Sequence, residues 1–234
     1  MPPIHISASL LSANFLCLED EMKRSEEAGV HSFHLDIMDG HLAPNLSYGP
    51  PIVHKIRQGT RLPLDTHLMI DNPGIFLDDY IEIGADSILI HAEAYDISEV
   101  NPRDIKQTPR IATQIDYSLL EADLFHIKNN GVKAGITLNP GTEINIIEPI
   151  LKECDSVLIM SVNPGYSGQA FIESTLDKIQ ALRSIYSGDI KVDGGINNVT
   201  APRVIEAGAN VLVTASYLYG SSNYKEAVNS LTKL

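Results

Sequence analysis

Residues 33–40 read Phe-His-Leu-Asp-Ile-Met-Asp-Gly, and the first six alternate between apolar and polar or sulfur-bearing side chains. Successive side chains of a strand point to opposite faces, so His34, Asp36 and Met38 share one face while Leu35 and Ile37 share the other. Burying an imidazole and a carboxylate without partners is costly, and a divalent cation satisfies them as well as a salt bridge does. The stretch therefore predicts a strand whose polar face needs partners from elsewhere in the chain.

Short apolar segments and amphipathic helical segments alternate from one end of the chain to the other. The eight predicted strands are 4–10, 32–38, 62–69, 87–91, 133–138, 156–162, 190–193 and 211–215. The predicted helices between them include 18–28, 73–83, 119–129, 144–153, 171–186 and 198–207. This alternation favours a parallel sheet or barrel.

Two further regularities support repeated strand-helix units. A glycine follows several predicted helices, where a residue with positive φ commonly ends a helix: Gly29, Gly84, Gly131 and Gly208. Most predicted strands end in a polar residue, and in a (β/α)8 barrel all such ends meet at the face that carries the chemistry. With 234 residues against about 250 in typical barrels, residues 1–234 are expected to form a single (β/α)8 TIM barrel domain.

One segment interrupts the alternation of predicted strands and helices. Residues 94–119, with Pro102 and Pro109, are too long for an ordinary connection between a strand and a helix. Because this segment follows the fourth strand, we expect an insertion at the site face. It could serve as a lid, a dimer contact or an ornament, and no catalytic motif is recognisable in it.

Composition restricts the partners. The formal net charge of −13, without a Lys/Arg cluster, argues against binding to nucleic acid or to anionic lipid. Apolar runs are too short for a transmembrane helix, and the N-terminal residues lack a secretory signal pattern. Two separated cysteines, Cys17 and Cys154, suit a reducing compartment. We therefore expect a cytoplasmic protein, and one that forms a homo-oligomer.

A metal site is the strongest chemical prediction. His67 ends the third predicted strand and Asp193 ends the seventh. In a barrel these ends approach His34 and Asp36, which are about 6.6 Å apart along their own strand. The resulting set of two imidazoles and two carboxylates suits one divalent ion of Zn, Fe(II), Mn or Co. Taken singly, each residue is more often a satisfied core histidine or a turn-forming aspartate than a metal ligand, and only the four together indicate a metal site.

A second constellation suits an anion. Residues 163–169 read Asn-Pro-Gly-Tyr-Ser-Gly-Gln after the sixth predicted strand, and Ala215-Ser216 follows the eighth. Barrels often bind phosphate in this region, because exposed backbone N–H groups there point at the anion. The loop includes Gly165, Tyr166, Ser167 and Gly168, and Gly194-Gly195 lies nearby in the fold. An Asn-Pro-Gly sequence alone could be an ordinary turn.

The chain resembles the ribulose-phosphate 3-epimerase family over nearly its whole length. The matching motifs are 8–13, 34–51, 65–69, 138–142, 160–171 and 192–197. The resemblance implies a (β/α)8 barrel and a divalent metal held by His34, Asp36, His67 and Asp193. It also implies a substrate hydroxyl contact from Ser9 and phosphate binding by Gly165 to Gly168, Gly194-Gly195 and Ala215-Ser216.

The chain departs from the family at several positions. Ser167 replaces a glycine of the usual Gly-Phe-Gly-Gly loop, Ala215 replaces the glycine of a Gly-Ser turn, and Ala8 replaces a proline. Two of these lie where the backbone approaches the phosphate, and glycine normally permits such an approach. The preferred sugar length is therefore open.

The expected reaction is the inversion of C3 of D-ribulose 5-phosphate to D-xylulose 5-phosphate through an enediolate. Asp36 and Asp193, from the second and seventh strands, would flank the substrate as acid and base. Two alternatives stay open: a 3-epimerase of a six-carbon ketose phosphate such as allulose 6-phosphate, and a non-catalytic sugar-phosphate-binding barrel.

Overall fold

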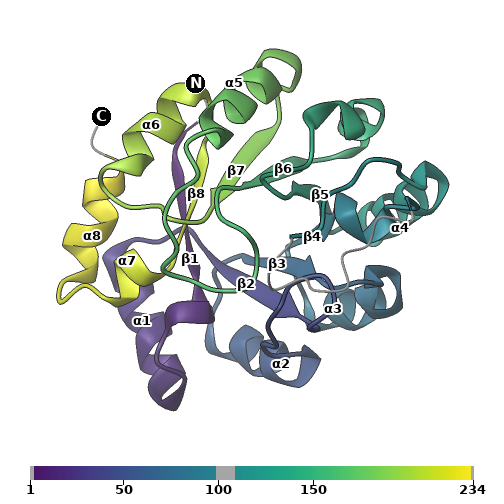
Figure 1. Ribbon diagram of the computed structural model, residues 1–234. Helices are drawn as coiled ribbons and strands as arrows, with labels where there is room; N and C mark the ends of the chain where they lie inside the picture. The colour runs from purple at the N-terminus through teal and green to yellow at the C-terminus, as the bar shows by residue number, and fades with distance from the viewer. Residues whose placement is uncertain (1–2, 99–108, 233–234) are drawn as a thin grey trace.

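The computed structural model describes residues 3–98 and 109–232. Its strands form a closed parallel barrel (Figure 1). They are β1 (His5–Ser9), β2 (Ser32–Met38), β3 (Leu64–Met69), β4 (Ser87–His91), β5 (Lys133–Leu138), β6 (Ser156–Met160), β7 (Asp189–Asp193) and β8 (Val211–Thr214). Each strand pairs with its neighbours in sequence, and β1 closes the barrel against β8. The predicted (β/α)8 fold is confirmed.

Helices surround the barrel (Figure 1). The α-helices are α1 (Leu18–Ala28), α2 (Pro50–Gly59), α3 (Leu77–Ile83), α4 (Tyr117–Asn129), α5 (Thr175–Ile185), α6 (Thr200–Ala207), α7 (Ser216–Tyr219) and α8 (Tyr224–Leu231). Short 3-10 helices are η1 (Leu10–Ser12), η2 (Phe15–Cys17), η3 (Pro73–Phe76), η4 (Ala92–Tyr95), η5 (Ile144–Ile146) and η6 (Glu148–Glu153). None of the helices in the described ranges is long and apolar enough to cross a membrane.

Some predicted elements differ from the structure. The predicted helix 144–153 is wrong, because this stretch forms the 3-10 helices η5 and η6. Pro149 lacks an N–H and limits α-helical hydrogen bonding there. The predicted helix 73–83 begins with the 3-10 turn η3 before α3. The helices α2, α7 and α8 lie outside the predicted ranges. The four predicted helix-ending glycines have φ between 77° and 117°.

Strand alternation separates two packing environments. Ile88 and Ile90 of β4 join the main apolar core under the helices, whereas Leu89 packs in a separate cluster with Leu158 and Val213. Residues of β2 follow the same rule, because Leu35 and Ile37 belong to the main core. The side chains between them therefore point into the barrel. Parallel pairing then sets His34 beside Asp65 and Asp36 beside His67.

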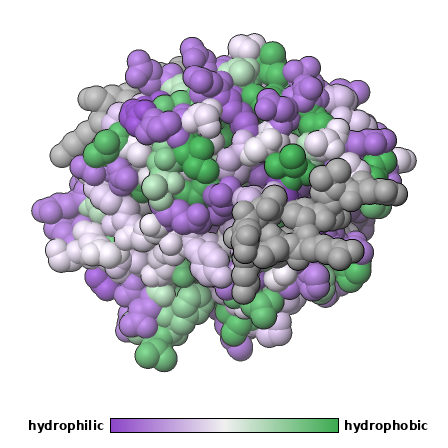
Figure 2. Space-filling model, in the orientation of Figure 1, coloured by the Kyte–Doolittle hydropathy of each residue, from purple (hydrophilic) through white to green (hydrophobic). Residues whose placement is uncertain are grey.

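The predicted insertion 94–119 lies only partly within the described ranges, since 99–108 fall outside them. Its described ends are joined by an antiparallel bridge between Asp96 and Ile115, and α4 begins at Tyr117. Figure 2 shows the molecule in the orientation of Figure 1, with hydrophobic residues scattered in small groups among hydrophilic ones.

Candidate active site

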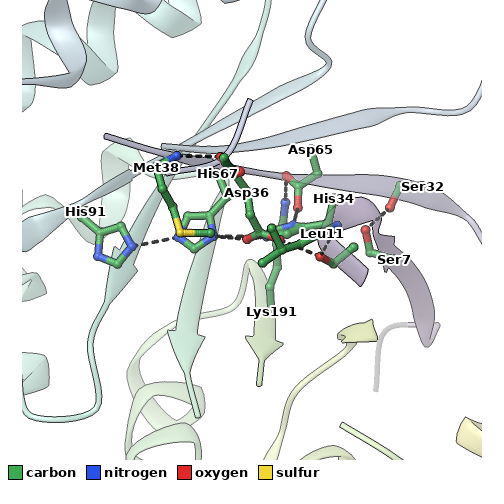
Figure 3. A network of polar contacts seen from close by, with 12 residues as sticks. Ser7, Leu11, Ser32, His34, Asp36, Met38, Asp65, His67, His91 and Lys191 are labelled. Carbon is green, nitrogen blue, oxygen red and sulfur yellow. Dashed lines mark hydrogen bonds and ion pairs between the residues drawn. The ribbon is translucent and has the colours of Figure 1, made fainter. Parts of the chain in front are cut away.

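Side chains on the inward-facing sides of β2 and β3 form a buried polar cluster (Figure 3). His34 and His67 are fully buried, and Nε2 of His34 lies 3.2 Å from Nδ1 of His67. The carboxylate of Asp36 lies 3.1 Å from that Nδ1 atom and accepts a 2.6 Å hydrogen bond from the Ser9 hydroxyl. Asp193 ends β7 across the barrel. One ligand atom from each of His34, Asp36, His67 and Asp193 lies within 4.8 Å of all the others.

This cluster fits a divalent cation. Two imidazole nitrogens and two carboxylate oxygens are the donor types that borderline transition metals prefer. Without an ion, three of these groups face one another inside the barrel at distances near 3 Å, and the nitrogens of two imidazoles approach each other. The residues present could therefore hold one metal ion.

A second carboxylate, that of Asp65, binds the ring nitrogen of His34 that faces away from the cluster. Asp65 accepts a 3.0 Å hydrogen bond from Nδ1 of His34 and pairs at 2.5 Å with the ammonium group of Lys191. Burial alone would raise the pKa of Asp65, but Lys191 and His34 hold it well below its usual range. An ionised Asp65 keeps a hydrogen on Nδ1 of His34, and the Nε2 atom faces the cluster.

The two aspartates of the cluster have opposite acid–base preferences. Burial alone would raise the pKa of Asp36, but the neighbouring His34 and His67 lower it below its usual range. Burial and the charge of Asp36 raise the pKa of Asp193 to about 7. In the metal-free site Asp36 is therefore ionised, whereas Asp193 keeps a proton below about pH 7.

A pocket of about 510 Å³, measured with its open mouth, leads from this cluster to solvent. Its wall includes three methionines, Met38, Met69 and Met160, each 5% exposed or less. Among the described residues, its lining includes Ser9, Asp36 and Asp193 but no lysine or arginine. A negatively charged ligand in this pocket must therefore bind to backbone N–H groups and hydroxyls.

The far wall consists of the glycine loop after β6 and the turns after β7 and β8. The pocket lining includes Gly165, Tyr166, Ser167, Gly168, Gly194, Gly195, Ala215 and Ser216. Nδ2 of Asn45 donates to the Gly165 carbonyl at 2.7 Å, and the Tyr166 hydroxyl donates to the Pro44 carbonyl at 2.8 Å. Residues from the loop after β2 thus hold the glycine loop over the pocket.

The departures from the family pattern do not require positive φ. Among the described residues, every residue with positive φ is a glycine, so neither Ser167 nor Ala215 lies in the left-handed region. The cost of replacing glycine at these two positions is therefore the space taken by the new side chain, and the backbone path is preserved.

The structure brings together all the site residues expected from the sequence. His34, Asp36, His67 and Asp193 form the cluster, and the pocket lining includes Ser9 and the loop residues. Sequence reasoning missed Asp65 and Lys191 as supports of the cluster. Each lies two residues before a predicted ligand on the same strand, so alternation alone places it on the same inner face.

The pocket of this (β/α)8 barrel leads to buried carboxyl and imidazole groups. Enzymes with this fold carry their active site at the carboxyl ends of the strands, where this pocket lies. The family model described as "Ribulose-phosphate 3 epimerase family" matches residues 5–113 and 114–219. The chain belongs to this family, and it is an enzyme of the isomerase class.

Curated relatives agree. The chain is 41% identical to ribulose-phosphate 3-epimerase of Bacillus subtilis, an alignment that covers 97% of this chain and 98% of the relative. It is 42% identical to the chloroplastic ribulose-5-phosphate-3-epimerase of Arabidopsis thaliana, over 97% of this chain and 76% of the relative. A solved 3-hexulose-6-phosphate synthase from Salmonella typhimurium superposes with a TM-score of 0.69 at 13% identity, covering 97% and 96% of the two chains, which indicates a shared fold.

Proposed function

We propose that this protein is a metal-dependent epimerase that inverts C3 of D-ribulose 5-phosphate to give D-xylulose 5-phosphate. The observation that carries the proposal is the placement of Asp36 and Asp193, which reach one cluster from separate strands and line the same pocket. The names and near-complete coverage of the relatives support the choice of substrate.

Epimerisation at C3 needs a base on one face of the carbon and an acid on the other. Removal of the C3 proton moves its bonding pair into a C2–C3 double bond and leaves negative charge on the C2 oxygen, which is the enediolate. Return of a proton to the opposite face of C3 restores the carbonyl. Around the closed barrel, β1 and β8 lie between β2 and β7, so Asp36 and Asp193 approach a substrate at the mouth from different sides.

His34, Asp36, His67 and Asp193 would hold one divalent ion, of Zn, Fe(II), Mn or Co. Such an ion supplies positive charge that stabilises the negative charge of the enediolate. The chain itself orients Asp36, because the Ser9 hydroxyl donates to one carboxylate oxygen and His67 contacts the other. The three methionines of the pocket wall are buried and apolar, and they would limit the access of water to the reacting carbon.

The phosphate group would bind at the glycine wall through the backbone of Gly165 to Gly168, Gly194-Gly195 and Ala215-Ser216. The lack of a basic side chain among the described lining residues supports recognition by backbone N–H groups. Positive φ at Gly168 and Gly194 turns the loops toward the pocket.

Replacing Gly168 by alanine tests this assignment. Gly168 has a φ of 78° with no atom within 4 Å of an added Cβ. Alanine should cost about 1 to 2 kcal/mol of stability and reshape the loop, which should raise KM for the sugar phosphate about tenfold. The matched control is Gly29→Ala, since Gly29 ends α1 on the other side of the barrel with a φ of 93° and equally open surroundings. Equal KM values in the two variants would remove the glycine loop from the phosphate site.

Incubation of the enzyme with ribulose 5-phosphate in deuterated water tests the reaction itself. NMR should show deuterium entering at C3 while xylulose 5-phosphate accumulates. Allulose 6-phosphate in a parallel reaction tests the six-carbon alternative, and a higher kcat/KM for it would replace the five-carbon assignment. Binding of either sugar without exchange at C3 would instead indicate a non-catalytic sugar-phosphate-binding barrel. The expectations of a homo-oligomer and of a cytoplasmic location stay predictions.

A further inference from the structure

His67 is held through both of its ring nitrogens. Its Nδ1 atom faces Asp36 and His34, and its Nε2 atom lies 2.8 Å from Nε2 of His91 (Figure 3). A neutral imidazole ring carries one hydrogen, on either Nδ1 or Nε2. Which nitrogen carries that hydrogen decides whether Nδ1 can act as a metal ligand.

The hydrogen-bond chain beyond His91 decides the question. Nδ1 of His91 lies 2.9 Å from Oε2 of Glu93, and an ionised carboxylate can only accept a hydrogen bond. With one hydrogen on its ring, His91 therefore donates from Nδ1 and accepts at Nε2. His67 must then donate from its own Nε2 atom, which leaves the lone pair of Nδ1 facing the cluster.

Glu93 is itself fully enclosed and saturated with donors. It is 0% exposed, and its Oε1 atom accepts from the backbone N–H of Asn139 at 2.8 Å and from the Thr142 hydroxyl. Burial alone would raise the pKa of Glu93, but the hydrogen bonds from His91, Thr142 and Asn139 lower it. Both carboxylate oxygens are thus assigned as acceptors.

The described end of the long connection after β4 contacts the Glu93 backbone and the residues that bind its carboxylate. The Arg110 guanidinium donates to the Glu93 carbonyl at 3.0 Å and pairs with Asp71. The Arg110 carbonyl accepts from the side chain of Asn139 at 2.9 Å. The N–H of Ala112 donates to the Thr142 hydroxyl at 3.0 Å. Residues 110–112 therefore fasten the same groups that hold Glu93.

We propose that Glu93 is a positioning residue of the metal site, which acts through His91 to hold His67 in the tautomer that presents Nδ1 to the ion, and that Arg110 keeps Glu93 in place. The value of this tautomer for catalysis rests on the proposed metal dependence. The tautomer itself depends on contacts within the chain: the relay through His91 and Glu93 draws the hydrogen of His67 to Nε2, and Nε2 of His34 faces the Nδ1 lone pair at 3.2 Å, whereas the Asp36 carboxylate, 3.1 Å from Nδ1, competes for the same hydrogen.

Glu93→Gln is the decisive variant. The side chain keeps its size, and its one carbonyl oxygen remains required by Asn139 and Thr142, so the amide N–H₂ group turns toward His91. His91 then accepts at Nδ1 and donates from Nε2, which moves the hydrogen of His67 to Nδ1. We expect ¹⁵N NMR of the metal-free protein to report His67 protonated at Nε2 in the parent and at Nδ1 in the variant.

Metal affinity gives the second readout. Competition of the protein with a chelator for Zn²⁺ or Co²⁺ should show binding weakened by about 10- to 100-fold in Glu93→Gln, the usual effect of losing such a support. A parent protein that shows the Nε2 tautomer but binds neither ion would refute the proposed metal dependence and leave the hydrogen-bond assignment intact. A Glu93→Gln protein with unchanged His67 tautomer and unchanged affinity would overturn the positioning role.

Arg110→Met keeps the proposal testable if Glu93→Gln does not fold. It should weaken binding of Zn²⁺ or Co²⁺ about three- to tenfold. Without Arg110, Glu93 is held less firmly, so in part of the molecules the hydrogen bonds between Glu93, His91 and His67 run in the opposite direction. The matched control is Arg57→Met, because Arg57 also donates to backbone carbonyls, those of Thr60 and Leu62, and pairs with an aspartate, Asp86. Both variants should lose stability, and only Arg110→Met should lose affinity. Equal affinities in the two variants would remove Arg110 from the proposal.

Discussion

Asparagine in place of Asp36 or of Asp193 is expected to lower kcat by about 10³-fold or more. Each replacement removes one of the two groups that exchange a proton with C3, and such groups contribute up to about 10⁴-fold to the rate. The side chain keeps its size, so substrate should still enter the pocket. Initial rates of xylulose 5-phosphate formation, measured with saturating metal, provide the test, and near-normal kcat in either variant would refute its acid–base role.

Asp189→Asn is the matched control for these two variants. Asp189 begins β7 at the opposite end of the strand from Asp193, and its carboxylate accepts a 2.7 Å hydrogen bond from Asn210. The replacement changes an aspartate on the same strand at a distance from the pocket. Its kcat should stay within about twofold of the parent value, since no group that meets the substrate is altered.

Thermal unfolding of the metal-free variants gives an independent check, because the two replacements should change Tm in different ways. The pKa of Asp36 is lowered in the folded state, so its ionised form stabilises the fold above its unfolded pKa, and Asp36→Asn should lower Tm at pH 8. The pKa of Asp193 is raised from 3.8 to about 7, so the fold loses stability as the pH rises between these two values, and the full loss is present at pH 8. Asp193→Asn should therefore leave Tm unchanged or raise it at pH 8.

Removal of the metal ion is expected to abolish epimerisation, and the affinity for the returning ion should rise steeply with pH. Burial alone would lower the pKa of His34, but Asp36 and Asp65 raise it to about 10, so the metal-free site carries a proton on His34 up to that pH. Asp193 carries a second proton below about pH 7. Both groups must lose their protons to bind an ion, whereas His67 is already neutral above about pH 4.

Metal affinity should rise with pH because protons and the ion compete for the same ligand atoms. Between about pH 4 and pH 7, two protons leave on binding, so affinity should rise about 100-fold per pH unit. Between about pH 7 and pH 10 one proton leaves, and the rise should fall to about tenfold per unit. Chelator competition with Zn²⁺ at several pH values measures both slopes. Asp193→Asn should remove the change of slope, and full activity in rigorously metal-free protein would refute the metal requirement.

Much of the fold follows from local pattern. Alternating strands and helices, closed by glycines such as Gly29 and Gly84, predict the (β/α)8 barrel because each such unit has one stable way to pack beside the next. The error at 144–153 arises because an apolar pattern with helical spacing does not distinguish an α-helix from 3-10 turns once Pro149 removes an N–H. Helix boundaries elsewhere depend on capping contacts that form only in the folded chain.

The sequence by itself determined that His34 and Asp36 share one face of a strand, since side-chain direction in a strand follows from position alone. It also placed His67 and Asp193 near the carboxyl ends of strands, which meet at one face of a barrel. Only the tertiary structure decided how these groups are charged and which hydrogen each imidazole carries. Those properties depend on burial and on Asp65, Lys191 and Glu93, which reach the cluster through closure of the barrel. Protonation responds to every charge and dipole within a few ångströms, and those neighbours come from strands far apart in the chain.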